Sequence, residues 1–201
     1  MRLSFAVILC LSGLFFQAAA ADDAKPIIDN ERVTVWELTG FPTPPVPAAS
    51  HGSDAVSIVI ARNQGTAFFM PKGQGIVQGF SFNPDRTVLI ALKDHKVAPL
   101  PNTSGLPNAF PRPGVKKVLE NDRVIVWDYT WQPGKPTPMH FHDKDVVVVH
   151  LEDGSLKSTT PDGKSVVNDY SYGLTKFNLR NRTHTELLVK GTQHAIMMEL
   201  K

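Results

Sequence analysis

The chain has 201 residues, of which 42% are hydrophobic and 20% are charged, a balance typical of a folded protein with one large or two small cores. Its 21 basic and 19 acidic residues leave a net charge of +2, which gives no electrostatic reason to expect nucleic acid or an anionic membrane as a partner. The composition therefore indicates a folded protein and argues against functions that depend on a large charged surface.

Residues 1–21 have the pattern of a secretory signal peptide. Arg2 supplies an early positive charge, Leu3 to Phe16 is apolar, and a run of small residues follows. The apolar run is short for a bilayer span, so we expect cleavage near the end of this segment and a periplasmic or secreted mature protein. The single cysteine, Cys10, lies inside the segment, which excludes disulfides, cysteine-ligated zinc and thiol nucleophiles from the mature protein.

The rest of the chain contains an internal duplication. Residues 30–37, NERVTVWE, align with residues 121–128, NDRVIVWD, at an offset of 91 residues, and residues 54–60 align with residues 143–149 at an offset of 89. Each copy opens with a β-rich segment, crosses a Pro-rich loop and closes with an apolar segment that ends in Leu-Lys. Two tandem copies of one fold are therefore expected.

Strand-length apolar segments separated by Gly, Pro, Asn and Asp, without a sustained helical period, predict an all-β chain. Residues 98–114 contain five prolines and few apolar residues, which is typical of a stiff linker. We therefore expect a first domain over residues 22–97, a linker over residues 98–114 and a second domain over residues 115–201.

The densest group of chemically active side chains lies between Gly134 and Gly154. His140 and His142 are one residue apart, so in an extended strand their imidazoles point the same way, as two ligands of one metal ion must. The spacing Gly, five residues, His-x-His and a closing Gly resembles the first motif of the cupin family. In that motif three or four residues separate the second histidine from a glutamate, and here the position expected for the glutamate is occupied by Val147.

The second cupin motif is matched in spacing by Gly173 and His184. The resemblance implies two tandem cupin-like barrels of the double-stranded β-helix or jelly-roll type, the second holding one divalent metal on His140, His142 and His184. Three neutral imidazoles suit Fe, Zn, Mn, Ni or Cu and leave coordination positions open. Without a glutamate ligand the site carries more positive charge, which favours an anionic ligand and makes Mn less suitable.

Glu186 is the candidate catalytic residue. If a strand continues past His184, Glu186 lies two positions further and shares its face. It could then serve as a fourth ligand, an ion-pair partner or a general base, or it could lie solvated at the mouth of the barrel. The sequence leaves these roles open.

The first copy lacks the ligand set. His51 aligns with His140 at the offset of 89, but Ser53 stands where the second copy has His142, and Ile58 stands at the glutamate position. We expect this degenerate barrel to bind no metal and His51 to lie in a surface loop.

Alternation along residues 145–151 predicts that Val147 and Val149 face the barrel interior, whereas Val146, Val148 and His150 face outward. Valine side chains on the outer face of the sheet must be buried against another apolar surface. We expect an apolar interface on this sheet, formed either with the other copy or with a second subunit in a homodimer.

Three classes of function follow. The first is a secreted bicupin whose second barrel binds a metal and a small polar or anionic molecule, with no nucleic acid and no membrane as partner after signal cleavage. The second is an iron-dependent dioxygenase, because cupins with three histidines and no glutamate include thiol dioxygenases. The third is a metal-free structural or interaction protein, which the degenerate first copy favours.

Overall fold

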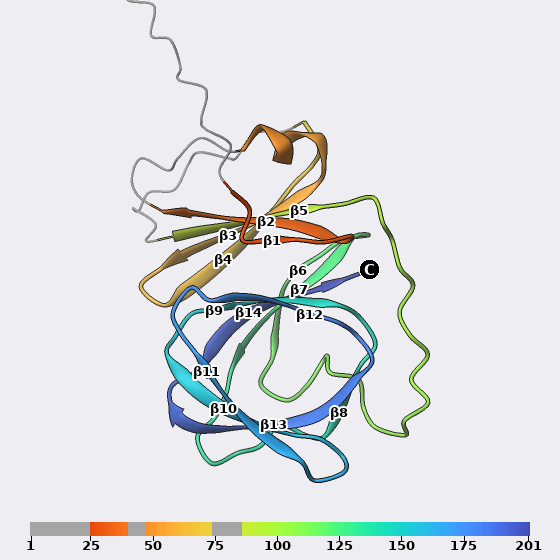
Figure 1. Cartoon of the computed structure of the whole chain (residues 1–201), viewed down its shortest axis with the longest axis vertical. Coiled ribbons are helices and arrows are strands. Elements are labelled where there is room, and N and C mark those ends of the chain that lie inside the picture. The colour runs from red at the N-terminus through yellow and green to blue at the C-terminus, as the bar shows by residue number, and fades with distance from the viewer. Residues whose placement is uncertain (1–24, 40–46, 74–85) are drawn as a thin grey trace, which may run out of the picture.

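The computed structural model describes residues 25–39, 47–73 and 86–201, and over these ranges the chain is all-β apart from one short 3-10 helix, η1 (Ala48–Gly52). The all-β prediction is confirmed. Figure 1 shows the sheet of the first copy stacked on the barrel of the second. No helix in the described ranges is long and apolar enough to cross a membrane. The predicted signal peptide, residues 1–21, lies outside the described residues.

The first copy forms one antiparallel sheet of five strands, in the order β1-β2-β5-β3-β4. Its strands are β1 (Ile28–Asp29), β2 (Val33–Thr39), β3 (Ala55–Ala61), β4 (Gln64–Met70) and β5 (Arg86–Leu92).

The second copy forms two sheets that enclose a barrel. One has the order β12-β9-β14-β7-β6 and the other has the order β11-β10-β13-β8. The strands are β6 (Lys116–Glu120), β7 (Val124–Thr130), β8 (His140–His142), β9 (Val146–His150), β10 (Gly154–Thr159), β11 (Ser165–Tyr170), β12 (Thr175–Asn178), β13 (Arg182–Gly191) and β14 (His194–Leu200).

Each copy contains a five-stranded sheet with the same strand order, here called the junction sheet. The order β1-β2-β5-β3-β4 corresponds strand by strand to β6-β7-β14-β9-β12. In the second copy β10 and β11 lie between β9 and β12 along the chain, whereas in the first copy β3 passes into β4 through Arg62 and Asn63 alone. Both residues have positive φ, 51° and 61°, as a tight two-residue hairpin requires. The predicted tandem copies are present, and the described residues of the first copy form one of the two sheets.

Reciprocal ion pairs join the copies. Arg32 of the first copy donates from Nη1 to Asp145 Oδ2 of the second at 2.6 Å, and Arg123 of the second donates from Nη1 to Asp54 Oδ2 of the first at 3.0 Å. The two arginines correspond in the sequence repeat, so these contacts are two halves of a pseudo-twofold arrangement. The copies therefore pack as the two subunits of a symmetric dimer would.

The backbone fixes how the copies align. Leu92 N donates to Asp54 O, and Leu200 N makes the equivalent bond to Asp145 O. Asp54 therefore corresponds to Asp145, so the offset of 91 holds in this segment too and the expected offset of 89 is wrong. A run of β-branched residues matches itself equally well after a shift of two positions, because such a shift preserves the face of every side chain.

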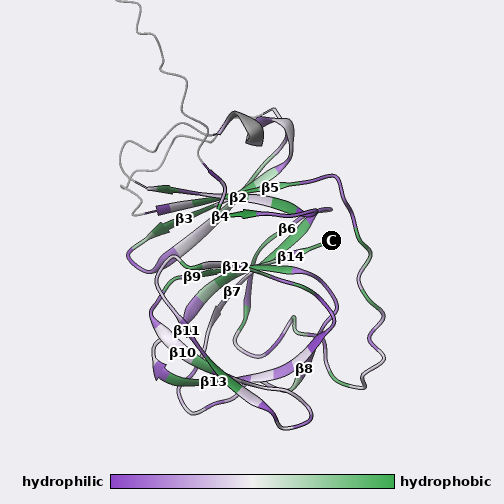
Figure 2. Ribbon diagram, in the orientation of Figure 1, coloured by the Kyte–Doolittle hydropathy of each residue, from purple (hydrophilic) through white to green (hydrophobic). Residues whose placement is uncertain are grey.

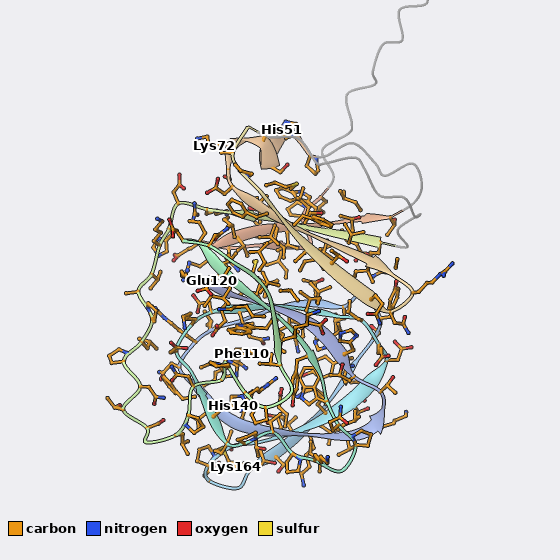
Figure 3. All side chains as sticks on the ribbon, turned by 180° about the vertical axis from the view of Figure 1, so that it is seen from behind. His51, Lys72, Phe110, Glu120, His140 and Lys164 are labelled. Atoms are coloured by element: carbon orange, nitrogen blue, oxygen red, sulfur yellow. The ribbon has the colours of Figure 1, made fainter. Side chains whose placement is uncertain are left out.

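His51 consequently corresponds to His142 and not to His140. It is exposed and belongs to η1. Figure 3 labels it at the end of the first copy that lies away from the barrel, whereas His140 lies inside the barrel. The position of His51 agrees with the expected surface location.

One apolar core fills the junction between the copies, which confirms the predicted interface on this sheet, with the first copy as its cover. Figure 2 shows hydrophobic strands on both sides of that junction. The buried side chains are Val33, Val35, Val56, Ile58, Ile60, Val88, Ile90 and Leu92 from the first copy, and Val124, Val126, Val147, Val149, Leu151, Ile196, Met198 and Leu200 from the second.

Side chains on β9 point opposite to the prediction. Val147 and Val149 pack against the first copy, whereas Val146 and Val148 belong to the core inside the barrel. Because side chains alternate with a period of two residues, an error of one residue reverses the whole strand. The motif's glutamate position therefore falls on Val146, with three residues between it and His142.

The Pro-rich segment 98–114 lies against the barrel. Phe141 N of β8 donates to Pro107 O at 2.9 Å, and Ala109 N donates to Phe141 O at 2.8 Å. These bonds attach the segment to the edge of the second sheet and bury the next side chains, Phe110 and Arg112. The segment expected as a linker thus also supplies residues to the barrel interior.

Candidate metal centre

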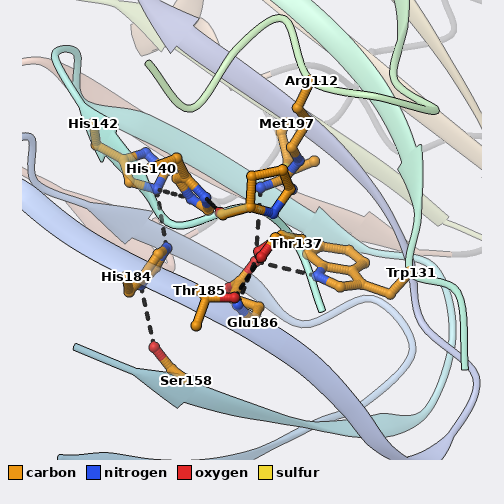
Figure 4. A network of polar contacts seen from close by, with 11 residues as sticks. Arg112, Trp131, Thr137, His140, His142, Ser158, His184, Thr185, Glu186 and Met197 are labelled. Atoms are coloured by element: carbon orange, nitrogen blue, oxygen red, sulfur yellow. Dashed lines mark hydrogen bonds and ion pairs between the residues drawn. The ribbon is translucent and has the colours of Figure 1, made fainter. Parts of the chain in front are cut away.

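His140, His142 and His184 meet inside the C-terminal barrel. β8 pairs antiparallel with β13, and this register sets His140 opposite His184. Phe141 separates the first two histidines, so both of their imidazoles leave the same face of β8. In Figure 4 the three rings converge, and His142 Nε2 lies 3.2 Å from His140 Nε2 and 3.1 Å from His184 Nε2.

Contacts at the outer ring nitrogens orient two of the imidazoles. His140 Nδ1 donates to Pro138 O at 2.7 Å, and His184 Nδ1 lies 3.2 Å from Ser158 Oγ. A ring that donates from Nδ1 keeps a free lone pair on Nε2, which is the form that binds a metal. His142 Nδ1 is buried and has no hydrogen-bond partner in the part of the chain that the structure describes.

Burial keeps the three imidazoles neutral. It lowers the pKa of His140 to about 4, and the charge of Arg112 adds to this effect. Burial also lowers the pKa of His142 and the pKa of His184, and at both rings the Arg182 charge acts in the same direction. The nitrogen lone pairs are therefore available at neutral pH.

The donor set fits one transition-metal ion. Imidazole nitrogens bound to one ion at about 2.0–2.1 Å lie about 2.9–3.4 Å apart in octahedral or tetrahedral geometry. The two Nε2 separations of 3.1 and 3.2 Å fall in this range, and the three nitrogens lie within 4.8 Å of one another. Lone pairs that face each other so closely repel unless a cation or a proton lies between them. The predicted histidines are thus brought together in a form that could hold a metal.

Glu186 lies beside the three histidines. Its Oε2 accepts a hydrogen bond from Trp131 Nε1 at 3.1 Å and lies 3.9 Å from Arg112 Nη1. Burial raises the pKa of Glu186, but His184, Arg112, His140 and the Trp131 hydrogen bond together lower it by more. Of the roles that the sequence leaves open, the structure brings Glu186 closest to that of an ion-pair partner.

Arg112 is a pocket residue that the sequence did not predict. Its side chain is 4% exposed, and its guanidinium carbon lies 4.1 Å from the centre of the Tyr129 ring, 4.9 Å from that of Phe110 and 5.6 Å from that of Trp131. The faces of these rings stabilise the buried cation. Burial lowers the pKa of Arg112, and the charge of Glu186 opposes this shift.

His142 and His184 open onto a pocket, here called the barrel pocket. Its charged and polar lining includes Arg112, His142, Asn178, Arg182, His184 and Glu186. Its apolar wall includes Trp131, Val146, Val148, Leu156 and Met197. The pocket thus combines a polar group next to the histidines with a hydrocarbon surface, as sites for small molecules do.

His150 also lines the barrel pocket, although the sequence predicts that it faces outward. Its ring stacks on Tyr170 with the centres 4.1 Å apart, and its Nδ1 donates to Gln193 Oε1 at 2.9 Å. Burial lowers the pKa of His150 to about 4. The inward direction follows from the same one-residue error on β9 that misplaced Val146.

No family model matches the sequence. A curated relative, the beta-alanine degradation protein BauB of Pseudomonas aeruginosa, is 43% identical over 60 residues, which cover 30% of this chain and 59% of that protein. The chain thus spans less than two thirds of the length of this relative.

Solved cupin structures resemble the chain. A cupin domain from Bordetella pertussis is 29% identical, with a TM-score of 0.41, and the match covers 45% of this chain and 97% of that one. A cupin 2 conserved barrel domain protein from Leptotrichia buccalis is 10% identical, with a TM-score of 0.49 and 88% of each chain covered. Both TM-scores lie below 0.5, so the fold rests on the chain's own strand order, in which two antiparallel sheets of the C-terminal half enclose the expected cupin-like barrel.

Proposed function

We propose that the C-terminal barrel binds one divalent transition metal through His140, His142 and His184, and that a small polar or anionic molecule binds beside it in the barrel pocket. The observation that carries the proposal is the convergence of three buried Nε2 atoms at 3.1 and 3.2 Å. Burial also favours the neutral form of each ring, so no proton competes strongly with a metal.

The charges around the site favour an anion. A divalent ion brings two positive charges, Arg112 and Arg182 bring one each, and Glu186 supplies the only negative charge among the pocket residues that the structure describes. The histidines are neutral and do not compensate the ion. When bound, the metal would act as a Lewis acid with open coordination positions.

Metal analysis of the purified mature protein tests the proposal. We expect about one equivalent of a first-row transition metal in the protein as isolated, or after incubation with Fe, Zn, Mn, Ni or Cu salts followed by desalting. The triple variant with alanine at His140, His142 and His184 should retain none. A wild-type protein that binds no more metal than this variant would exclude the proposal.

An oxygenase is the second candidate, because the inward position that carries glutamate in the cupin motif is Val146. The ligand set would then be three neutral nitrogens, which leaves several positions of an iron ion free for substrate and oxygen. Oxygen uptake by the iron-loaded protein with a panel of thiols, diketones and phenols tests this. Lack of uptake across the panel would favour a binding function.

The relative's name gives the proposal a metabolic context. BauB is described as a β-alanine degradation protein, and β-alanine is a small molecule that carries a carboxylate. We place the mature protein in the periplasm or outside the cell on the basis of residues 1–21. Cell fractionation of a tagged chain, with a variant lacking this segment as control, tests the location.

A further inference from the structure

Arg112 is a buried cation whose hydrogen-bonding capacity is mostly unused. Nη2 contacts Met197 Sδ at 3.9 Å, Nη1 lies 3.9 Å from Glu186 Oε2, and Nε has no hydrogen-bond partner among the described residues. A guanidinium carries five N–H donors, and buried charged donors without acceptors are costly. We propose that the carboxylate of a small organic acid supplies the missing acceptor by binding to Arg112 in the barrel pocket.

The position of Arg112 supports a ligand that spans two anchors. The arginine lines the same pocket as His142 and His184. A ligand held at the guanidinium can therefore extend toward the histidines along the wall that contains Leu156 and Met197. The apolar wall suits a hydrocarbon body, and the two polar ends orient it.

The surroundings of Arg112 favour a carboxylate over a tetrahedral dianion. Tyr129, Phe110 and Trp131 surround the guanidinium at 4.1 to 5.6 Å, so an acceptor must approach its edge. A planar carboxylate matches that edge. Glu186 already places one negative charge 3.9 Å from Nη1, and the repulsion it exerts on a dianion such as phosphate is about twice that on a monoanion.

This inference deepens the proposed function, but the arginine contact does not require a metal. The same titration on the metal-stripped and the zinc-loaded protein therefore separates the two proposals. Binding of a carboxylate to metal-stripped protein supports the role of Arg112 even if no metal site exists. A protein that binds zinc but no carboxylate in either form would leave the metal site standing and overturn the inference.

Isothermal titration calorimetry with butanoate as the probe is the test. We expect butanoate to bind, and butanamide and inorganic phosphate to bind at least about tenfold more weakly. Arg112→Met should weaken butanoate binding by about tenfold or more, whereas Arg182→Met should change it less, because Arg182 Nε already donates to Leu179 O at 2.6 Å. Unchanged binding in Arg112→Met, or a larger loss in Arg182→Met, would overturn the inference.

Glu186→Gln makes the test independent of the folding of the arginine variant. It removes the negative charge next to Arg112 and retains the shape of the side chain. Butanoate should bind this variant more tightly than the wild type, by a few-fold to about tenfold. A general loss of structure cannot produce tighter binding. Equal or weaker binding of butanoate to a folded Glu186→Gln protein, judged by its circular dichroism and thermal unfolding, counts against a carboxylate at Arg112.

Discussion

The two copies of the chain each contain a junction sheet of the same strand order and differ in what is added to it. The two junction sheets pack against each other and form the apolar junction between the copies. The three histidines all lie on the other sheet of the second copy, on β8 and β13. In the first copy the two-residue turn at Arg62 and Asn63 replaces the β10–β11 hairpin that extends this other sheet. The junction sheets therefore hold the two copies together, whereas the other sheet of the second copy carries the candidate ligand-binding site.

The largest effect should come from a negative charge placed in the junction sheet of the second copy. Val147 is fully buried between the copies, so Val147→Glu puts a carboxylate in an apolar core without a partner. We expect a loss of more than about 4 kcal/mol of unfolding free energy, enough to prevent folding of most of the protein. Urea denaturation followed by tryptophan fluorescence measures this loss.

Val146→Glu is the matched variant, because it places the same side chain one residue earlier and inside the barrel. There it lies in the pocket lined by His142 and restores the carboxylate of the cupin motif. Zinc should stabilise Val146→Glu by more than it stabilises the wild type, and it should not rescue Val147→Glu. The opposite pattern would mean that Val147 faces the barrel interior and Val146 faces outward, as the sequence predicted.

The next largest effect concerns the metal ligands. His142→Ala should lower metal affinity by more than about 100-fold, because it removes a ligand and not only an outer-shell partner. The matched control is His51→Ala in the first copy, since His51 is exposed and corresponds to His142. Metal content after dialysis against a weak chelator measures both variants. Equal loss in the two would place the metal outside the barrel.

The sequence was sufficient for those features that depend on short spacings. Strand alternation puts His140 and His142 on one face, and the second motif supplies His184, so the cluster could be predicted before the barrel was seen. Which side chains of β9 face the barrel interior could not be predicted in the same way. Residues 146–149 are all valine, so the run has no polar side chain to mark its solvent or pocket face.

Arg112 could not be predicted for a different reason. It lies in a Pro-rich segment with no regular period, and its position depends on hydrogen bonds between this segment and Phe141 of β8. Such long-range contacts leave no mark in local sequence spacing. The pairing of Arg112 with Glu186 could not be predicted for the same reason. The sequence indicates that Glu186 lies on a strand, but it does not indicate which residue pairs with it.

The next prediction is a difference in the unfolding free energy that each of the two reciprocal ion pairs contributes. The Arg32 and Asp145 side chains are 9% and 6% exposed, whereas those of Arg123 and Asp54 are 15% and 26% exposed. Asp145→Ala removes the carboxylate that pairs with the buried Arg32, so we expect a loss of about 3–5 kcal/mol of unfolding free energy. Asp54→Ala should cost about 1 kcal/mol or less, because water reaches Arg123. Equal losses in urea denaturation would contradict an asymmetric junction.

The smallest effect should be on the pH dependence of the unfolding free energy, which we expect to differ between the wild type and a variant of His150. Its equivalent in the first copy is Val59, at the offset of 91, so His150→Val makes the second copy resemble the first. Burial lowers the pKa of His150 from 6.5 to about 4, so between these values the unfolded chain binds more protons than the folded one.

Protonation of His150 should therefore destabilise the fold as the pH falls from about 6.5 to about 4, by up to about 3 kcal/mol. The contribution is fully favourable above the higher value and is lost on acidification. His150→Val should flatten the dependence of unfolding free energy on pH in this window, measured by urea denaturation of metal-stripped protein at intervals of pH. The remaining slope in the variant includes the contribution of the three histidines of the cluster, whose pKa values are also lowered by burial. An unchanged slope in His150→Val would mean that His150 is accessible to water in the folded barrel.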